Sequence, residues 1–235
     1  FRPESKTTPL RIVYDASAKA GPHLPSLNDC LEKGPNLLPK IFGIMIRNRF
    51  RRLVITGDIS KAFHMIRVHP DDRDAQRILW YGDLKDRKVR EYRFTRVIFG
   101  ATSSPYILNA TIQKHLEKYE NDTRYAHTVQ ALKTDTYVDD VSGWGENPEE
   151  VKHFKKQATE LLKQGGFHLC KWNSNIPELD EGKDSTVKFL GTSWNKLQDT
   201  FSVKADVTQP TILTKRKLLA YINGTFDVLG WAGPW

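Results

Sequence analysis

The most informative stretch of the sequence is TDTYVDDVSGW, residues 134–144. Apolar residues flank the adjacent acids Asp139 and Asp140, which predicts two short strands joined by a tight turn. The turn would place two carboxylates at the tip of a buried hairpin, where burial and mutual repulsion oppose ionisation of both. A divalent cation offsets that repulsion, because hard cations take oxygen ligands. An ordinary loop with two acids is the alternative.

A third acid strengthens the metal interpretation. The segment LVITGDI, residues 53–59, is rich in β-branched residues and predicts a buried strand with Asp58 near its end. If this strand lies beside the hairpin, Asp58, Asp139 and Asp140 meet at one edge of a sheet. Three carboxylates can hold two cations about 3.5–4 Å apart, the arrangement that activates an attacking oxygen and stabilises a leaving one. The competing interpretation of Asp58 is an N-cap of the following turn.

The remaining pattern mixes helices and strands. Helical spacing is found in residues 36–50, and a polar helical turn is expected over 71–77. Aromatic-rich segments at 78–81 and 89–94 predict a β-hairpin. Ser104 at the N-cap and Pro105 at N1 predict a helix start, and Asn147 caps a second helix that ends at the glycine pair 165–166. The order of these elements predicts an α+β fold.

Composition limits the classes of function. The chain has 235 residues, a net charge of +8 and a sequence pI of about 9.4, which suits a polyanionic partner. Its lack of an apolar run of membrane-spanning length predicts no membrane partner. The two cysteines cannot form a disulfide framework, and no secretory signal is evident, so we expect a cytoplasmic location. Since the sequence does not begin with Met, we expect it to be part of a longer polypeptide.

Several segments, taken in order, resemble the conserved motifs of reverse transcriptases. DISKAF at 58–63 resembles motif A, FGATSSP at 99–105 resembles motif B, and YVDD at 137–140 resembles motif C. GGFHLCKW at 165–172 resembles motif D, and FLGTSW at 189–194 resembles motif E. Upstream, RIVYD at 11–15 resembles the fingers segment that precedes motif A. Four further segments resemble the BEL/Pao group of LTR retrotransposons: VYDASAK at 13–19, SLND at 26–29, KWNSN at 171–175 and LTKR at 213–216.

The resemblance implies RNA-directed DNA polymerase activity. Asp58 and Asp139 would be the principal metal ligands and catalytic residues, Asp140 would assist, and the carbonyl of Ile59 would face the nucleotide-bound metal. The cofactor would be two Mg²⁺ ions, with Mn²⁺ as an alternative. A primer 3′-OH would attack the α-phosphate of a dNTP and release pyrophosphate, with the metal ions carrying most of the charge stabilisation.

The resemblance also assigns residues to the nucleotide and the primer. Phe63 matches the aromatic gate that excludes a 2′-OH, and a core phenylalanine is the equal alternative. Phe99 stands where retroviral enzymes carry Gln, and Gly100 would let the backbone approach the nucleotide or template. Gly191 and Trp194 would shape the primer grip, although Trp194 fits the core equally well.

Basic residues complete the implied site. Arg11 matches the fingers arginine that grips the triphosphate, and Lys6 its companion lysine, a role for which Arg2 competes. Lys171 matches the motif D lysine that protonates pyrophosphate. A sequence-independent phosphate track would include the arginines at 47, 49, 51, 52, 90, 93 and 96.

Taken together, we expect a right-hand polymerase with an antiparallel palm sheet backed by helices. Its fingers would comprise residues 1–57 and 70–98, its palm 58–69 and 99–195, and a partial thumb 196–235. The partners would be an RNA or DNA template with its primer, dNTPs, and the protease, RNase H and integrase of a retrotransposon polyprotein in a virus-like particle. The alternatives are a catalytically silent copy that binds nucleic acid, and a related polymerase that makes RNA from RNA.

Overall fold

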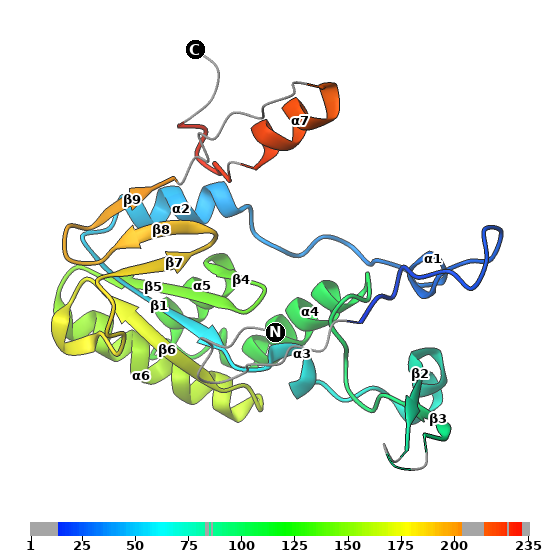
Figure 1. Ribbon diagram of the computed structural model, residues 1–235. Coiled ribbons are helices and arrows are strands. Elements are labelled where there is room, and N and C mark those ends of the chain that lie inside the picture. The colour runs from blue at the N-terminus through cyan, green and yellow to red at the C-terminus, as the bar shows by residue number, and fades with distance from the viewer. Residues whose placement is uncertain (1–13, 83–84, 86, 204–213, 225, 232–235) are drawn as a thin grey trace. The chain divides into compact units, whose positions relative to one another are not determined.

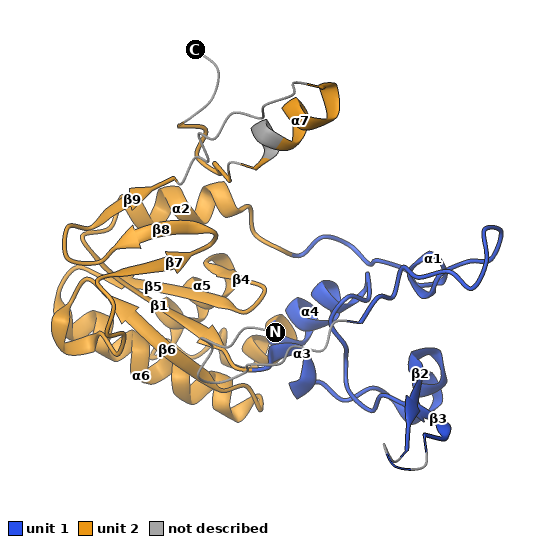
Figure 2. Cartoon of the chain, viewed as in Figure 1, with its two compact units in different colours: residues 1–37, 61–112 blue, residues 38–60, 113–235 orange. Residues whose placement is uncertain are grey.

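The computed structural model describes residues 14–82, 85, 87–203, 214–224 and 226–231 (Figure 1). The chain divides into two compact units (Figure 2): residues 1–37 and 61–112 form unit 1, and residues 38–60 and 113–235 form unit 2. No helix in the described part of the chain is long and apolar enough to cross a membrane. The assignment of residue ranges to fingers, palm and thumb stays a prediction.

Unit 2 is built on a four-stranded antiparallel sheet in the order β4-β5-β1-β6. These strands are β4 (Thr136–Tyr137), β5 (Asp140–Gly145), β1 (Leu53–Ile59) and β6 (Leu169–Ser174). Helices α5 (Ala126–Thr134) and α6 (Pro148–Gln164) pack against it (Figure 1). The strand predicted over 53–59 and the hairpin predicted around the acid pair are therefore confirmed.

The α6 helix follows from its caps and its apolar stripe. Asn147 Oδ1 accepts a hydrogen bond from the Glu150 backbone N–H at 3.0 Å, and Pro148 opens the first turn as predicted. Phe154 and Leu161 are buried on the face toward the sheet, at helical spacing. The helix ends at Gln164 with Gly165 as its C-cap, as predicted from the glycine pair. This cover buries the face of the sheet behind the predicted acids.

A second sheet in unit 2 consists of β7 (Thr186–Phe189), β8 (Thr192–Asn195) and β9 (Thr200–Ser202). Helix α2 (Ile41–Arg49) joins it in one core cluster, in which Met45 and Trp194 are almost fully buried. The helix predicted from residue 36 begins later than expected, because Pro39 disfavours a helical conformation at the residue before it. The remaining elements of the unit are η2 (Glu117–Tyr119), η3 (Pro177–Leu179) and α7 (Lys215–Asn223).

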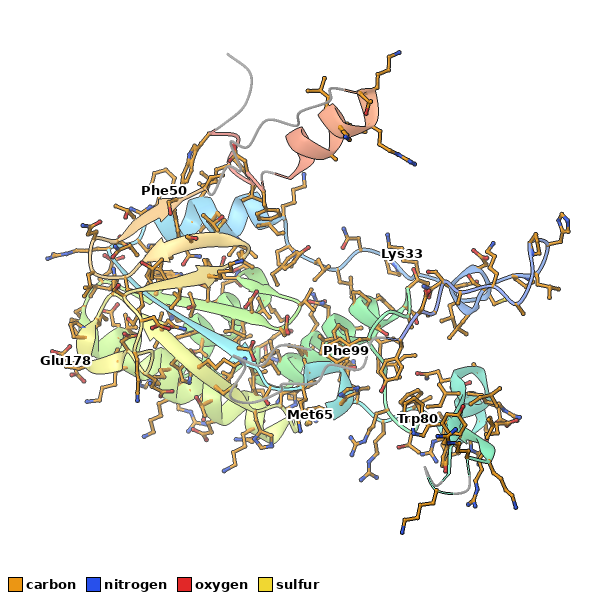
Figure 3. All side chains as sticks on the ribbon, in the orientation of Figure 1. Lys33, Phe50, Met65, Trp80, Phe99 and Glu178 are labelled. Carbon is orange, nitrogen blue, oxygen red and sulfur yellow. The ribbon has the colours of Figure 1, made fainter. Side chains whose placement is uncertain are left out.

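Unit 1 contains short elements and one hairpin. They are α1 (Leu27–Cys30), α3 (Ala62–Met65), η1 (Pro70–Gln76), β2 (Arg77–Tyr81) and β3 (Val89–Arg93). The β2–β3 pair confirms the predicted hairpin, and its Trp80 projects into solvent with 58% of its surface exposed (Figure 3). The helical turn predicted over 71–77 is the 3₁₀ helix η1.

Helix α4 (Ser104–Leu116) begins in unit 1 and corrects the predicted cap. Ser104 is already the first helical residue rather than the N-cap. Its hydroxyl donates to the carbonyl of Ile98 at 2.6 Å, which ties the helix start to the preceding loop. With both units described, the mixture of helices and antiparallel sheets confirms the predicted α+β class.

Candidate active site

The three predicted acids lie together at one end of the β1–β5 strand pair. Asp58 and Asp140 are direct partners in the antiparallel register, so their side chains project from the same face of the sheet. Asp139 lies in the turn between β4 and β5, where its carbonyl accepts a hydrogen bond from the Ile59 N–H at 2.8 Å. Asp58 is a strand residue, which rules out the N-cap alternative. The structure thus places these backbones side by side, while their catalytic roles stay predictions.

The turn that carries Asp139 holds a strained residue. Val138 has φ of 55°, in the left-handed region that β-branched side chains disfavour. Tyr137 anchors the turn from the other side, because its ring packs against the core cluster that contains Met45 and Trp194. Strain of this kind persists where surrounding structure enforces it, and it is common at functional sites.

Burial and neighbouring charges both disfavour ionisation of Asp140. Burial, followed by the negative charges of Asp139 and Asp58, raises the pKa of Asp140 to about 6, and the Lys171 cation opposes this rise only in part. A carboxyl whose ionisation is disfavoured by neighbouring carboxylates gains from a cation placed among them.

A β-bulge in β6 brings two further side chains to Asp58. The β1–β6 register shifts between Thr56 and Asp58, and Lys171 at the bulge has φ of 55°. Its ammonium Nζ lies 3.3 Å from Asp58 Oδ2, although the lysine side chain is 62% exposed. The bulge thereby places Lys171, the lysine predicted for motif D, beside Asp58, an arrangement that spacing along the sequence does not reveal.

Cys170 is a neighbour of the acids that sequence reasoning missed. Its Sγ lies 3.5 Å from the carbonyl oxygen and 3.7 Å from Oδ1 of Asp58. Burial, and then the charge of Asp58, raises the pKa of this thiol. The thiol form is therefore favoured, and Cys170 acts as a weak donor to Asp58. Cys170 is the partner of Asp58 in the β1–β6 register. This pairing is known only once the strands are aligned, so the sequence alone gave no sign that Cys170 lies beside the acids.

Within the described residues, no group of three or more His, Cys, Asp or Glu side chains is arranged to hold a metal ion. The donor chemistry of the acid cluster nevertheless fits a hard divalent cation, because all three carboxylates offer oxygen ligands. The raised pKa of Asp140 is consistent with this fit, since burial and then the charges of Asp139 and Asp58 disfavour its ionisation, and a cation would offset both effects. The assignment of Asp58, Asp139 and Asp140 as ligands of Mg²⁺ or Mn²⁺ stays a prediction.

In unit 1, the predicted gate residue belongs to an aromatic cluster. Phe63 is 7% exposed, and its ring meets that of Phe99 edge to face at a centroid distance of 4.8 Å. His64 meets Phe99 at 5.1 Å, and burial, then the charges of Lys61 and Arg96, lowers the pKa of His64. Phe99 remains 42% exposed (Figure 3). Phe63 is thus a packed residue beside an exposed ring, and its role as a gate stays a prediction.

Gly100 is required by the backbone. Its φ is 90°, and a Cβ at this position would lie 2.6 Å from the carbonyl oxygen of Tyr14. This contact explains the glycine by a close approach within the chain itself. An approach to nucleotide or template stays a prediction.

The two predicted primer-grip residues lie in the β7–β8 hairpin. Gly191 has φ of 85° in the turn, and Trp194 is 2% exposed in the core cluster, where its Nε1–H donates to Asp199 Oδ1 at 2.9 Å. Trp194 is therefore a core residue, the alternative that the sequence left open. The assignment of Gly191 and Trp194 to a primer grip stays a prediction.

Two predicted triphosphate contacts, Arg11 and Lys6, lie outside the described residues, as does Arg2. Several arginines of the predicted phosphate track contact the chain itself. Arg47 reaches Asp135 Oδ1 and the Thr134 carbonyl, both at 2.7 Å. The others with such contacts are Arg49 with Asp199, Arg51 with Glu146 and Trp144, Arg93 with Asp74, and Arg96 with the Met65 carbonyl. Charge alone could not distinguish these contacts within the chain from contacts with phosphate.

The fold and the comparisons together define the class of protein. The family model described as "Reverse transcriptase (RNA-dependent DNA polymerase)" matches residues 15–193, and the α+β architecture is that of the right-hand polymerases, as predicted. The chain belongs to the reverse transcriptase family. The activity of this family is RNA-directed DNA polymerisation, a nucleotidyl transfer.

Solved structures support the fold. The foamy viral protease-reverse transcriptase in complex with an RNA/DNA hybrid is 18% identical with a TM-score of 0.54, over 83% of this chain and 23% of that one. The foamy viral protease-reverse transcriptase dRH in complex with double-stranded DNA is 19% identical with a TM-score of 0.50, over 74% and 27%. The chain thus spans about a quarter of these proteins. No curated protein sequence matches it.

Proposed function

We propose that this chain is the polymerase part of a reverse transcriptase that adds dNTPs to a primer 3′-OH on an RNA or DNA template. The observation that carries the proposal is the facing pair Asp58 and Asp140, with Asp139 in the adjoining turn. Three acids on one sheet edge meet the requirement of phosphoryl transfer for an anionic site that concentrates divalent cations.

Two divalent cations held by Asp58, Asp139 and Asp140, with the Ile59 carbonyl as a further ligand, would supply activation of the primer hydroxyl and neutralisation of phosphate charge. The protein's own groups do the rest. Lys171, whose Nζ lies 3.3 Å from Asp58 Oδ2, would exchange this ion pair for a phosphate and deliver a proton to the departing pyrophosphate. Phe63 and Phe99 would bound the sugar, and Gly191 would shape the primer grip with Trp194 supporting it from the core.

The proposal extends to the source of the chain. The segments at 13–19, 26–29, 171–175 and 213–216 support a BEL/Pao-type retrotransposon polyprotein, with protease, RNase H and integrase elsewhere in it. The similar foamy viral proteins are protease-reverse transcriptases, which supports this kind of organisation. We place the protein in cytoplasmic virus-like particles, where such polyproteins act. The net charge of +8 supports binding of template and primer.

Primer extension tests the proposal. The wild type and Asp139→Asn are given an RNA template, a DNA primer, dNTPs and Mg²⁺, with the exposed-acid variant Asp72→Asn as a matched control. We expect extension by the wild type and the control, and none by Asp139→Asn. Extension by all three would remove Asp139 from the mechanism. If none extends, salt-dependent binding of template–primer would indicate the catalytically silent alternative.

Sugar discrimination separates the DNA polymerase from the RNA-making alternative. Phe63 is buried against Phe99, so Phe63→Val shortens the side chain without adding a polar group. We expect the wild type to reject ribonucleotides and Phe63→Val to accept them, with Leu108→Val in helix α4 as a packing control that leaves the preference unchanged. Unchanged discrimination in Phe63→Val would contradict the gate role.

A further inference from the structure

The segment SLND at 26–29, which lies outside the acid cluster, forms a capped turn of helix that fixes the position of Asn28. Ser26 caps helix α1: its hydroxyl accepts from the Asp29 N–H at 3.2 Å, while Asp29 Oδ2 accepts from the Ser26 N–H at 3.0 Å. On the exposed side, Lys19 Nζ forms an ion pair with Asp29 Oδ2 at 2.8 Å. The Asn28 N–H donates to the Ala16 carbonyl at 2.9 Å. This short helix therefore fixes the backbone of Asn28, and with it the origin of its side chain.

The Asn28 amide bridges to the backbone of the loop that resembles motif B. Its Nδ2 donates to the Gly100 carbonyl at 3.0 Å, and its Oδ1 accepts from the Thr102 N–H at 2.8 Å. Nδ2 also donates to Ser17 Oγ at 2.9 Å. Both amide N–H groups and the amide oxygen are thus used, and only a side chain with donor and acceptor on one planar group can do this.

We call the hydrogen bonds of Asn28 to Gly100 and Thr102 the clamp. The clamp restrains a loop whose backbone is conformationally free at Gly100. Gly100, with φ of 90°, lacks the side chain that would restrict it, and the Tyr14 carbonyl lies against it. The neighbouring residue is Phe99, whose ring contacts Phe63 edge to face. Fixing Gly100 and Thr102 on either side of Ala101 therefore also restricts Phe99, the loop residue whose ring contacts Phe63 of helix α3.

We propose that Asn28 is a positioning residue for nucleotide selection: by holding the 99–102 loop, it sets the rings that bound the incoming sugar. This inference rests on the proposed function, in which Phe63 and Gly100 face the dNTP. Asn28 itself contacts only the chain. Its loss should therefore weaken dNTP binding and sugar discrimination while leaving the acid cluster of unit 2 unchanged.

The clamp is tested first without any activity. In hydrogen–deuterium exchange of the peptide 99–104, we expect Asn28→Ala to speed exchange of the Thr102 amide about tenfold, the effect of one lost hydrogen bond. Asn28→Asp keeps the acceptor for Thr102 and loses both donors, so its Thr102 amide should stay protected. Ser17→Ala, which removes only the outer contact, should match the wild type. Equal exchange in Asn28→Ala and the wild type would overturn the proposal.

Steady-state kinetics then separate positioning from a general loss of stability. We expect Asn28→Ala to raise KM for dNTP about tenfold with kcat within about threefold of the wild type, and to lower the preference for deoxynucleotides. A fall in kcat alone would overturn the proposal. So would an unchanged preference for deoxynucleotides in an Asn28→Ala variant whose Thr102 amide exchanges faster than that of the wild type. If the clamp is seen by exchange but the wild type extends no primer, the proposed function fails and this role fails with it. Loss of the clamp with unchanged polymerase activity overturns the positioning role alone.

Discussion

Replacement of Asp140 by Asn should stabilise the metal-free protein at alkaline pH. The Asp140 carboxyl is held opposite Asp58 and next to Asp139, and burial together with these charges raises its pKa from 3.8 to about 6. Because the folded pKa lies above the unfolded one, the folded state binds the proton more tightly. The contribution of this proton to the free energy of unfolding is fully present below pH 3.8 and is lost as the pH rises through about 6.

The magnitude follows from the size of this shift. A difference of about two pKa units corresponds to roughly 3 kcal/mol of destabilisation at pH 8, and solvent screening makes this an upper bound. Asn cannot ionise, so Asp140→Asn should remove the cost. For a protein of this size, 1 kcal/mol corresponds to about 2–4 °C in thermal midpoint, so a rise of up to about 6–12 °C is expected.

The assay is thermal unfolding in EDTA at pH 8 and pH 4, with Asp72→Asn as the exposed-acid control. Asp140→Asn should gain stability at pH 8, and most of that gain should be absent at pH 4, where the wild-type Asp140 is protonated. Mg²⁺ should narrow the difference at pH 8 by stabilising the wild type. An equal gain at both pH values, or none at pH 8, would refute the assignment of the cost to ionisation of the buried Asp140 carboxyl.

Three further substitutions test the surroundings of the site. Val138→Gly should stabilise unit 2 by about 1 kcal/mol in urea unfolding, because glycine tolerates the φ of 55°; destabilisation would show that the turn carries no such strain. Lys196→Met should lower the free energy of unfolding by about 3–5 kcal/mol, because the Asp180 carboxylate, whose Oδ2 lies 2.6 Å from the buried Lys196 ammonium, loses its partner. The double variant with Asp180→Asn should recover much of this stability. Failure to recover it would mean that packing of the lysine side chain, rather than the ion pair, accounts for the loss. Gly100→Ala should cost about 1–3 kcal/mol, because its Cβ would meet the Tyr14 carbonyl; wild-type stability would mean that the loop moves freely.

The strand and helix pattern of unit 2 could be predicted because local signals agree with tertiary packing. The β-branched run ending at Asp58 forms the buried strand β1, and the apolar residues around Asp139 and Asp140 form the hairpin. Both acids of the pair could be expected to meet Asp58, since antiparallel neighbours share an edge. Capping also gave a reliable prediction at Asn147, where the side chain and a proline act within one turn.

Features that depend on distant partners could not be predicted. The bulge that turns Lys171 to Asp58 arises from the pairing of β6 with β1, which has no local sequence signal. Arg47 looked like a phosphate ligand because its charge does not reveal the buried acid, Asp135, to which it binds. Asn28 stood in a segment noted only for its resemblance, and its role appears only once the loop at Gly100 lies beside it.

The most direct test of the central claim is the rate of a single dNTP addition, measured with its template–primer affinity, for the wild type, Asp58→Asn and Asp139→Asn. The acid cluster predicts that each variant loses at least about a hundredfold in rate at saturating Mg²⁺ and keeps its affinity for RNA template and DNA primer within about threefold. Rates equal to that of the wild type in either variant would contradict the assignment of nucleotidyl transfer to this cluster.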